Sequence, residues 1–530
     1  MADPGQANTL TISRSGANYV FTDAPAVAIT ASAPCVSVAN TASCPAATVR
    51  SFSVSLNDLN DAATVADSVA GEVRAAIFGG AGNDNLVGGK NIENQLNGDD
   101  FAGAGADTPT GGNREDRLID GGGNDVVTGG LGNDVINAGP GDDLFLSGAD
   151  PDGPDDLIGG PDRDRMDFRS RTAAMRISFD DVANDGAGCP GAGCEGDNFR
   201  SDIEEFTGGG GADTLIGNAG RNNLRGDDGN DTISGGGGND NLNGDQGDDV
   251  VSGENGNDQV SGGNGADIGS GGAGDDYLLT NFFEEADVYA GGPGIDELGG
   301  DGDSRDPLSI DLDGVADDGL VDGGTTAAKD NVLGDVEGFE GGGGDDILIG
   351  SAAPNEIEGG GGDDQIIGGG DALSGDDGSD TIDGGGGVDS LFGGGGSDSL
   401  RSRDSSSDQI DCGSSPDLLL ADGKDDPEAS CEKTSTGLVI GGSAKLAGKS
   451  IKLKLSCPAA EGIACKAKVK LKKGKKTVAS GKGKIGSGKS KQLKLKLKGG
   501  GLGGAKLKAS ASFKDAAGAK VTSSRKVRVR

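Results

Sequence analysis

Residues 208–279 consist of eight consecutive nonapeptides in one register: GGGGADTLI, GNAGRNNLR, GDDGNDTIS, GGGGNDNLN, GDQGDDVVS, GENGNDQVS, GGNGADIGS and GGAGDDYLL. The sixth position is an acid or its amide, and the eighth is aliphatic in every copy except one, which has Gly269. A flexible acidic linker needs no such register. A fixed period of this kind predicts a repeat architecture in which each copy stacks on the next.

Further copies run through residues 79–87, 111–146, 150–167, 291–299 and 341–401. The sixth-position carboxylates are the candidate metal ligands. They are Asp84, Asp116, Asp125, Asp134, Asp143, Asp155, Asp164, Asp213, Asp231, Asp240, Asp249, Asp258, Asp267, Asp276, Asp296, Asp346, Asp364, Asp380, Asp389 and Asp398.

Some copies depart from the pattern, and we expect weaker or empty sites there. Asn222 and Asn355 replace the sixth-position acid, and GGKNIENQL has Glu93 there. The copy at 368–374 is short, and Gly269 replaces the aliphatic residue.

Composition excludes an ordinary apolar core. Gly makes up 105 of 530 residues, the formal charge is −41, and aromatic residues are 3% with no Trp. A chain with so few hydrophobic residues and so much charge is normally disordered. Glycine adds to this, because it loses more backbone entropy on ordering than any other residue. Something other than apolar burial must therefore hold the fold together.

Histidine is absent. This excludes His-ligated zinc, Ser-His-Asp triads and Cys-His pairs. Two-carboxylate glycosidase chemistry needs no histidine, but a sugar cleft usually uses stacking aromatics, and this chain has few.

The GGxGxDxUx pattern resembles the repeats-in-toxin, or haemolysin-type calcium-binding, family. The resemblance implies a parallel β-roll with two nonapeptides per turn and calcium ions between loops of successive turns. Partners are then 18 residues apart, so that Asp213 and Asp231 share a site, as do Asp231 and Asp249. Asp240, Asp258 and Asp276 line the opposite edge. Calcium takes six to eight oxygen ligands, and carboxylates and carbonyls freed by glycine-rich bends supply them.

The expected fold is all-β, a parallel β-roll solenoid with two insertions followed by a small antiparallel β-sandwich. The insertions, which contain MRISFDDVANDG and LSIDLDGVADDG, resemble each other and are predicted to be duplicated structural excursions, with a binding role as the alternative. The predicted segments are an N-terminal β cap (1–78), roll (79–168), insertion (169–207), roll (208–299), insertion (300–340), roll (341–401), a disulfide-containing cap of the roll (402–435) and a basic immunoglobulin-like β-sandwich (436–530).

The C-terminal part inverts the charge. Residues 433–530 carry +25 and the preceding residues −66. Runs such as SIKLKLSC and KQLKLKLKG alternate with period two, which is typical of strands with one lysine face. That face is either only solvated or an anchor to anionic cell-envelope polymer or to the acidic roll. Nucleic acid is not an expected partner, because no helix-turn-helix, zinc knuckle or aromatic platform occurs.

The cysteines fall into close pairs, Cys35/Cys44, Cys189/Cys194, Cys412/Cys431 and Cys457/Cys465. Proximity favours local disulfides over free thiols or a metal site, and disulfides indicate an oxidising, extracytoplasmic compartment. No signal peptide is visible after Met1, and no apolar run approaches the ~20 residues of a membrane helix.

The repeats, the inserts, the Cys412/Cys431 segment and the basic tail together resemble multi-domain calcium-binding surface proteins of soil actinobacteria. We therefore expect a secreted or envelope-associated calcium-binding structural protein, such as an adhesin or matrix component, and not an enzyme. The alternative is a calcium-dependent secretion and folding module of an exported enzyme or toxin.

Overall fold

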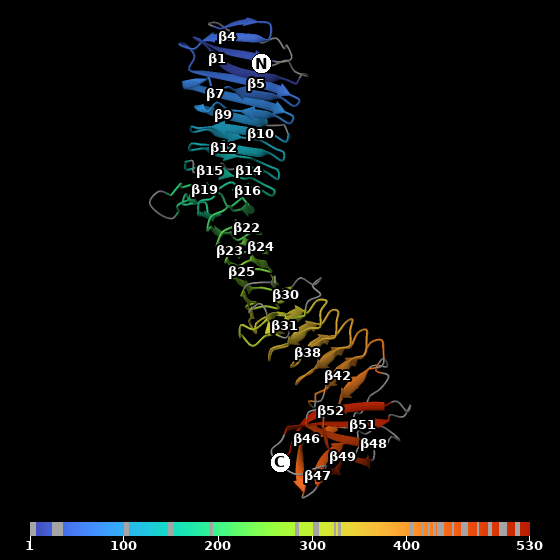
Figure 1. Ribbon diagram of the computed structural model, residues 1–530. Coiled ribbons are helices and arrows are strands. Elements are labelled where there is room, and N and C mark those ends of the chain that lie inside the picture. Colours follow the sequence, from blue (N-terminus) through green and yellow to red (C-terminus); the bar gives the residue numbers. More distant parts are fainter. Residues whose placement is uncertain are drawn as a thin grey trace. The chain divides into compact units, whose positions relative to one another are not determined.

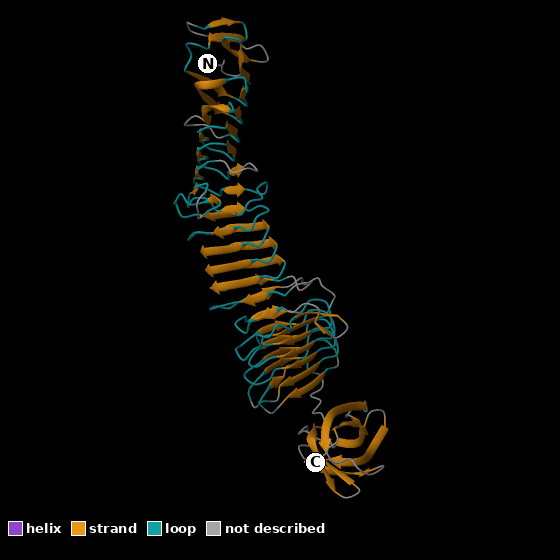
Figure 2. Ribbon diagram, turned by 60° about the vertical axis from the view of Figure 1, so that its left-hand side comes forward, coloured by secondary structure: helices purple, strands orange, loops and turns teal. Residues whose placement is uncertain are grey.

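The computed structural model describes residues 7–23, 35–99, 105–146, 153–189, 194–280, 286–299, 307–322, 325–326, 330–402, 404, 406–415, 417–421, 424–427 and 431, and the C-terminal strands between 439 and 529. Every regular element in these ranges is a strand (Figures 1 and 2). None of the described residues forms a helix long and apolar enough to cross a membrane.

Each nonapeptide makes one short strand that begins at its seventh position and one glycine-rich bend. Strands 18 residues apart pair in parallel, as Leu215 does with Ile233 and Ile233 with Val251. Side chains alternate along a strand, so the eighth-position residue points inward. Leu215 is fully buried, and the corresponding residues of the other copies form one aliphatic row inside each unit.

The described chain forms two compact units, residues 1–301 with 312–338, and residues 302–311 with 339–530. In the first unit one face of the roll, called face A, is a continuous parallel ladder of thirteen strands. They are β1 (Thr9–Ser15), β6 (Ala62–Val65), β8 (Asn85–Val87), β10 (Thr108–Gly112), β12 (Val126–Gly130), β14 (Leu144–Leu146), β16 (Arg165–Asp167), β20 (Glu205–Thr207), β22 (Asn223–Asp228), β24 (Asn241–Gln246), β26 (Gln259–Asn264), β28 (Tyr277–Leu279) and β30 (Glu297–Gly299).

The opposite face, called face B, consists of two separate sheets. The first contains β5 (Ser51–Asp58), β7 (Ala70–Ala81), β9 (Asn91–Asp99), β11 (Arg117–Ile119), β13 (Val135–Asn137), β15 (Asp156–Ile158) and β19 (Asn198–Phe199). The second contains β18 (Gly186–Ala187), β17 (Met175–Ser178), β21 (Thr214–Ile216), β23 (Thr232–Gly237), β25 (Val250–Asn255), β27 (Ile268–Ala273), β29 (Val288–Ala290) and β34 (Asn331–Val332). Face B therefore stops and restarts at the first insertion, whereas face A runs through it.

Parallel pairing of the roll type begins before residue 79, since β5 pairs with β7 and β6 with β8. Antiparallel strands β2 (Asn18–Asp23), β3 (Val36–Val38) and β4 (Thr41–Pro45) lie beside β1 at the N-terminal end. The predicted Cys35–Cys44 disulfide joins this part of the chain. Short antiparallel strands β32 (Gly319–Asp322) and β33 (Thr325–Thr326) form a hairpin in the second insertion.

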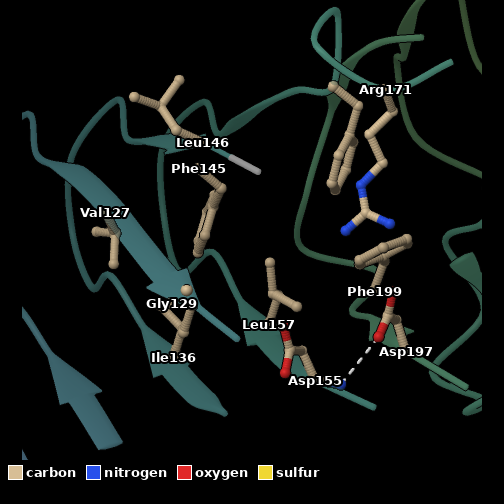
Figure 3. A pocket seen from close by; sticks show the side chains of 12 residues that line it. Val127, Gly129, Ile136, Phe145, Leu146, Asp155, Leu157, Arg171, Asp197 and Phe199 are labelled. Atoms are coloured by element: carbon tan, nitrogen blue, oxygen red, sulfur yellow. Dashed lines mark hydrogen bonds between the residues drawn. The ribbon is translucent and has the colours of Figure 1, made fainter. Parts of the chain in front are cut away.

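A buried ion pair links two parts of the first insertion. The side chains of Arg171 and Glu195 are both almost fully buried, and the distance from Nη1 of Arg171 to Oε1 of Glu195 is 2.7 Å. The Arg171 guanidinium also lies 5.3 Å from the ring centre of Phe168. The predicted Cys189–Cys194 disulfide closes the adjoining hairpin. Figure 3 shows Arg171 and Phe199 beside Leu157 of the roll, around a cavity of about 20 Å³, which has room for one water.

The two insertions repeat the same contacts, as the sequence similarity predicts. The backbone N–H of Asp155 donates to Asp197, 42 residues on, and that of Asp287 donates to Asp330, 43 residues on. Likewise the N–H of Asp164 donates to Glu204 and that of Asp296 to Glu337, 40 and 41 residues on. The excursions are thus structural duplicates that each return the chain to the roll in register.

The second unit continues the same nonapeptide pairing. One face contains β31 (Leu308–Asp311), β36 (Ile347–Ile349), β38 (Gln365–Ile367), β40 (Thr381–Asp383), β42 (Ser399–Ser402) and β44 (Leu418–Ala421). The other contains β37 (Glu356–Glu358), β39 (Ala372–Ser374), β41 (Ser390–Phe392), β43 (Gln409–Asp411) and β45 (Asp426–Pro427). Strand β35 (Gly338–Glu340) lies where the two units meet in sequence. The predicted Cys412–Cys431 disulfide is present.

The basic C-terminal strands close into one barrel instead of the two sheets of the expected sandwich (Figure 2). They are β46 (Val439–Ala447), β47 (Ser450–Ser456), β48 (Cys465–Lys473), β49 (Lys476–Ile485), β50 (Ser490–Leu497), β51 (Lys506–Lys514) and β52 (Lys520–Val529). The closing pair, β46 with β52, is parallel, which removes both sheet edges. The expected Cys457/Cys465 disulfide lies outside the described residues.

Several bends need glycine at the fourth repeat position. Gly247 has φ +133°, and a Cβ there would lie 1.6 Å from the carbonyl oxygen of Gly229, one turn earlier. The third-position Gly237 has no left-handed φ, and its nearest neighbour to a Cβ would be 3.6 Å away. The close stacking of successive bends is therefore specific to certain glycines.

We predict that Gly247→Ala weakens the central roll and Gly237→Ala does not. A left-handed φ in a residue with a Cβ costs about 1–3 kcal/mol, and the clash with Gly229 adds to it. Thermal unfolding of full-length variants in calcium, followed by circular dichroism, measures the difference. Equal melting temperatures for the two variants would show that the bends do not stack as described.

Candidate metal sites

The sixth-position aspartates form continuous ladders along the roll. In each of the candidate ligands named above, Oδ1 accepts a hydrogen bond from a backbone N–H, usually that of the sixth-position residue one turn earlier, at 2.6–3.0 Å. Asp213 donates to Asp231 at 2.7 Å, and Asp231 donates to Asp249 at 2.6 Å. Residues 18 apart thus lie on successive turns, as expected.

A second ladder follows the other edge of the same stretch. It passes from Asn222 through Asp240, Asp258 and Asp276 to Asp296. Two ladders arise because consecutive nonapeptides lie on opposite faces, so alternate copies stack on each other. This is the assignment of edges that the sequence predicts.

These carboxylates are buried, with Asp155 alone half-buried among them. Burial is the main cause that raises the pKa of ladder carboxylates such as Asp213, Asp240 and Asp346, each to about 6. The pKa of Asp231 is raised to about 7 by burial and by Asp213 and Asp249. In the second unit burial raises the pKa of Asp364 and Asp380 to about 7. The fold therefore places acidic groups where their ionised form is unfavourable unless a cation is near.

Oδ2, the second carboxylate oxygen of a ladder aspartate, is the atom available to coordinate a cation. In Asp231, Asp249 and Asp258, Oδ2 is buried and makes no hydrogen bond in the described part of the chain. None of these three residues forms an ion pair with a described lysine or arginine. An unpaired buried carboxylate is costly.

The donor set fits calcium. Hard carboxylate oxygens recur at every turn beside bends that bring backbone carbonyls close to the next turn, and calcium prefers such oxygens in flexible geometry. The sixth-position aspartates and the bend carbonyls would hold the ions. When bound, calcium supplies the positive charge that the ladder lacks.

The ladders also contain acids outside the predicted set. Their N–H or Oδ1 contacts have the same pattern as those of the nonapeptides. They are Asp61, Asp107, Asp197, Asp287, Asp330, Asp371, Asp408 and Asp417, with Glu204 and Glu337 at the insertions. Most lack the glycine-rich bend but keep an Asp two residues before an inward-facing residue, as in Asp287 and Tyr289. A search for that pair alone would have found them.

Two of the irregular copies continue the ladder in ways that their sequence pattern did not indicate. In GGKNIENQL the ladder residue is Asn94, which donates to Asp116 at 2.6 Å, whereas Glu93 is at the surface beside Arg74. The short copy at 368–374 keeps its ladder through Asp371, which accepts from Asn355.

Gly269 is not a gap in the core. A Cβ at Gly269 would lie 2.6 Å from the ring of Tyr289, which is the paired residue on the next turn and is fully buried. The missing side chain makes room for a larger one. The sequence repeat could not show this, because the residues before Tyr289, TNFFEEADV, contain no glycine and do not match the repeat.

One acidic cluster is denser than the rest. Asp107, Asp120 and Asp125 are buried, and one carboxylate oxygen of each lies within 4.8 Å of those of the others. Asp120 occupies the first repeat position, where glycine is usual. The cluster belongs to the edge ladder that runs through Asp107 and Asp125.

The fold and these ladders define a parallel β-roll protein with buried carboxylates along both of its edges. The family model for the RTX calcium-binding nonapeptide repeat (4 copies) matches residues 76–91, 110–145, 207–242, 243–278, 340–372 and 368–400. The chain therefore contains RTX-type calcium-binding nonapeptide repeats. No curated protein matches it.

We predict that Asp231→Ala and Asp249→Ala each raise the calcium concentration for half-maximal folding by about tenfold, because a charged ligand is lost. The two effects should be less than additive, because the residues share a site. Asp228→Ala removes the same charge from an exposed side chain of the same stretch and serves as the control. Calcium titration of full-length variants measures this, and three equal midpoints would exclude the ladder as the ligand set.

The raised pKa values predict acid-induced structure without calcium. Folding raises the pKa of Asp164 to about 8 and that of Asp231 to about 7, from the usual 3.8. The folded chain therefore holds more protons than the unfolded chain between about pH 4 and 8. Stability is therefore full below pH 4 and is lost as pH rises through that window. In chelator, the β signal should grow from pH 8 to pH 5, with sedimentation as the check on aggregation. A flat signal would contradict the burial of these carboxylates.

Proposed function

We propose that the protein is an extracellular, calcium-folded structural protein, secreted or associated with the cell envelope, such as an adhesin or matrix component. The observation that carries this proposal is the pair of buried carboxylate ladders, in which Oδ2 of Asp231, Asp249 and Asp258 makes no hydrogen bond with a described residue. The disulfides add support, because they persist in oxidising compartments.

The physical basis is a balance between charge and chain entropy. Glycine-rich bends lose much backbone freedom on ordering, and crowded carboxylates repel each other. Calcium offsets both by bridging oxygens of successive turns. The interior row of Leu and Ile alone is narrow, because each nonapeptide contributes one inward side chain. Folding is therefore expected to follow extracellular calcium.

The proposal that the chain is not an enzyme rests on its residue types. The absence of histidine removes most acid-base and nucleophilic devices. The competing proposal is a secretion and folding module of an exported enzyme or toxin. Hydrolysis of anionic polysaccharides by the purified chain would favour that alternative.

The basic tail supports a further proposal, an anchor to anionic cell-envelope polymer. Its charge of +25 contrasts with the acidic roll. Such binding must weaken as salt rises, because exposed charges are screened over about 8 Å at physiological ionic strength. Absence of binding to an anionic polymer at low salt would leave the tail as a solubility device.

We predict that chelation largely unfolds the roll segments and that millimolar calcium restores them. Extracellular calcium modules bind at about 10⁻⁴–10⁻³ M, and magnesium should substitute poorly because it demands a tight octahedron and retains its waters. Circular dichroism of the full chain during calcium and magnesium titrations is the test. A β signal that chelator leaves unchanged, or equal midpoints for both ions, would refute calcium-driven folding.

A further inference from the structure

Face A carries a polar cavity at the first insertion, away from the carboxylate ladders. It has a volume of about 150 Å³ and is lined by side chains from β16, β20, β22 and the residues that follow β16. Three arginines, Arg165, Arg169 and Arg225, contribute to its wall. In a roll that is otherwise acidic, this gathering of guanidinium groups needs an explanation.

The strand register places these groups on the outer surface. Met166, Phe206 and Leu224 pair across the three strands and are buried. The residues on either side of them therefore point outward. Arg165 is in register with Glu205 and Asn223, and Thr207 is in register with Arg225. The cavity lies over these two outward rows.

Two of the arginines are already used by carboxylates. Arg169 makes a forked contact with Asp167, and Arg225 makes a forked contact with Asp245 through Nε and Nη2 at 2.9 and 2.7 Å. Glu205 is paired with Arg163, 3.2 Å away. These pairs fix the walls of the cavity, because forked arginine–carboxylate contacts are geometrically specific.

Arg165 and Asp227 are the groups that remain. The only ion pair of Arg165 among the described residues is at 3.5 Å to Asp167, an oxygen that Arg169 already occupies. The Asp227 carboxylate makes no hydrogen bond or ion pair with a described residue, although Arg169 and Arg225 act on it through space. Strand β20 lies between them, so their strands are about 10 Å apart.

A ligand for this cavity needs an anion at one end and hydrogen-bond donors at the other. The guanidinium fork of Arg165 suits a carboxylate, and Asp227 accepts from hydroxyl groups. Thr207 and Asn223 line the cavity between them and can bond to further hydroxyls. A ring with several hydroxyls and one carboxylate has this arrangement, and the open outer face leaves room for a chain to continue on both sides.

We propose that this cavity binds a uronate residue of an acidic polysaccharide, with its carboxylate on Arg165 and its hydroxyls on Asp227, Thr207 and Asn223. The site is on the roll itself and is independent of the basic tail. It gives the acidic roll a local means of holding an acidic polymer. Its folding requirement is shared with the proposed function, but its chemistry is separate.

The test is binding of glucuronate and of glucose to the full chain in millimolar calcium, followed by saturation-transfer NMR and calorimetry. Glucuronate should bind with a dissociation constant on the order of millimolar, as small polar ligands do, and glucose at least tenfold more weakly. Arg165→Gln should weaken glucuronate binding at least tenfold, and Asp227→Asn should weaken it several-fold.

Arg117→Gln is the matched control. Arg117 holds the same seventh repeat position, on β11 of face B, and does not line the cavity. Calcium-induced folding is recorded for every variant, so that failure to fold is distinguished from failure to bind. Competition by sulfate as strong as that by glucuronate would reduce the site to a general anion site and overturn the proposal. Unchanged binding in Arg165→Gln would overturn it as well.

Discussion

The rest of the structure depends on one interaction, the hydrogen bond from the backbone N–H of one sixth-position residue to the carboxylate of the next turn. It repeats along both edges of the roll at nearly constant length. Each bond orients a carboxylate inward, out of water. The ladder thereby sets the stagger of the turns and also creates a row of acids that need positive charge. Structure and metal requirement have the same origin.

This constraint explains where the chain tolerates irregularity. Bends vary in length and composition, and two insertions of about forty residues interrupt them, yet every excursion returns through an acid that continues the ladder. Glu204 and Glu337 reach across with a longer side chain at the same point of each duplicate. The hydrogen-bonded ladder of Asp, Asn and Glu residues thus continues where the glycine-rich bend varies.

The two faces respond differently to the first insertion. Face A continues through β16, β20 and β22, whereas face B ends and restarts. The outer surface of face A at this point is where the arginines gather, held in forked pairs by acids on neighbouring strands. A break on one side of a solenoid can therefore be accompanied by a distinctive surface on the other. The acidic roll thus combines a repeated, cation-dependent interior with a locally individual exterior.

The sequence by itself determined the repeat, its register, the parallel roll, the two edges and most of the acids along them. The nine-residue period, with Asp and an aliphatic residue two positions apart, gives the repeat and its register, and the resemblance to the RTX family implies the roll and its two edges. Only the tertiary structure decided which residues act where the period fails. Asn94, and not Glu93, occupies the ladder position in its copy, and Asp371 continues the ladder in the short copy. The ring of Tyr289 fills the space that the missing side chain of Gly269 leaves. These depend on neighbours a full turn away, and the number of residues in an irregular turn cannot be read from a local pattern. The closure of the basic strands into a barrel is decided in the same way, by pairing between the first and last of them.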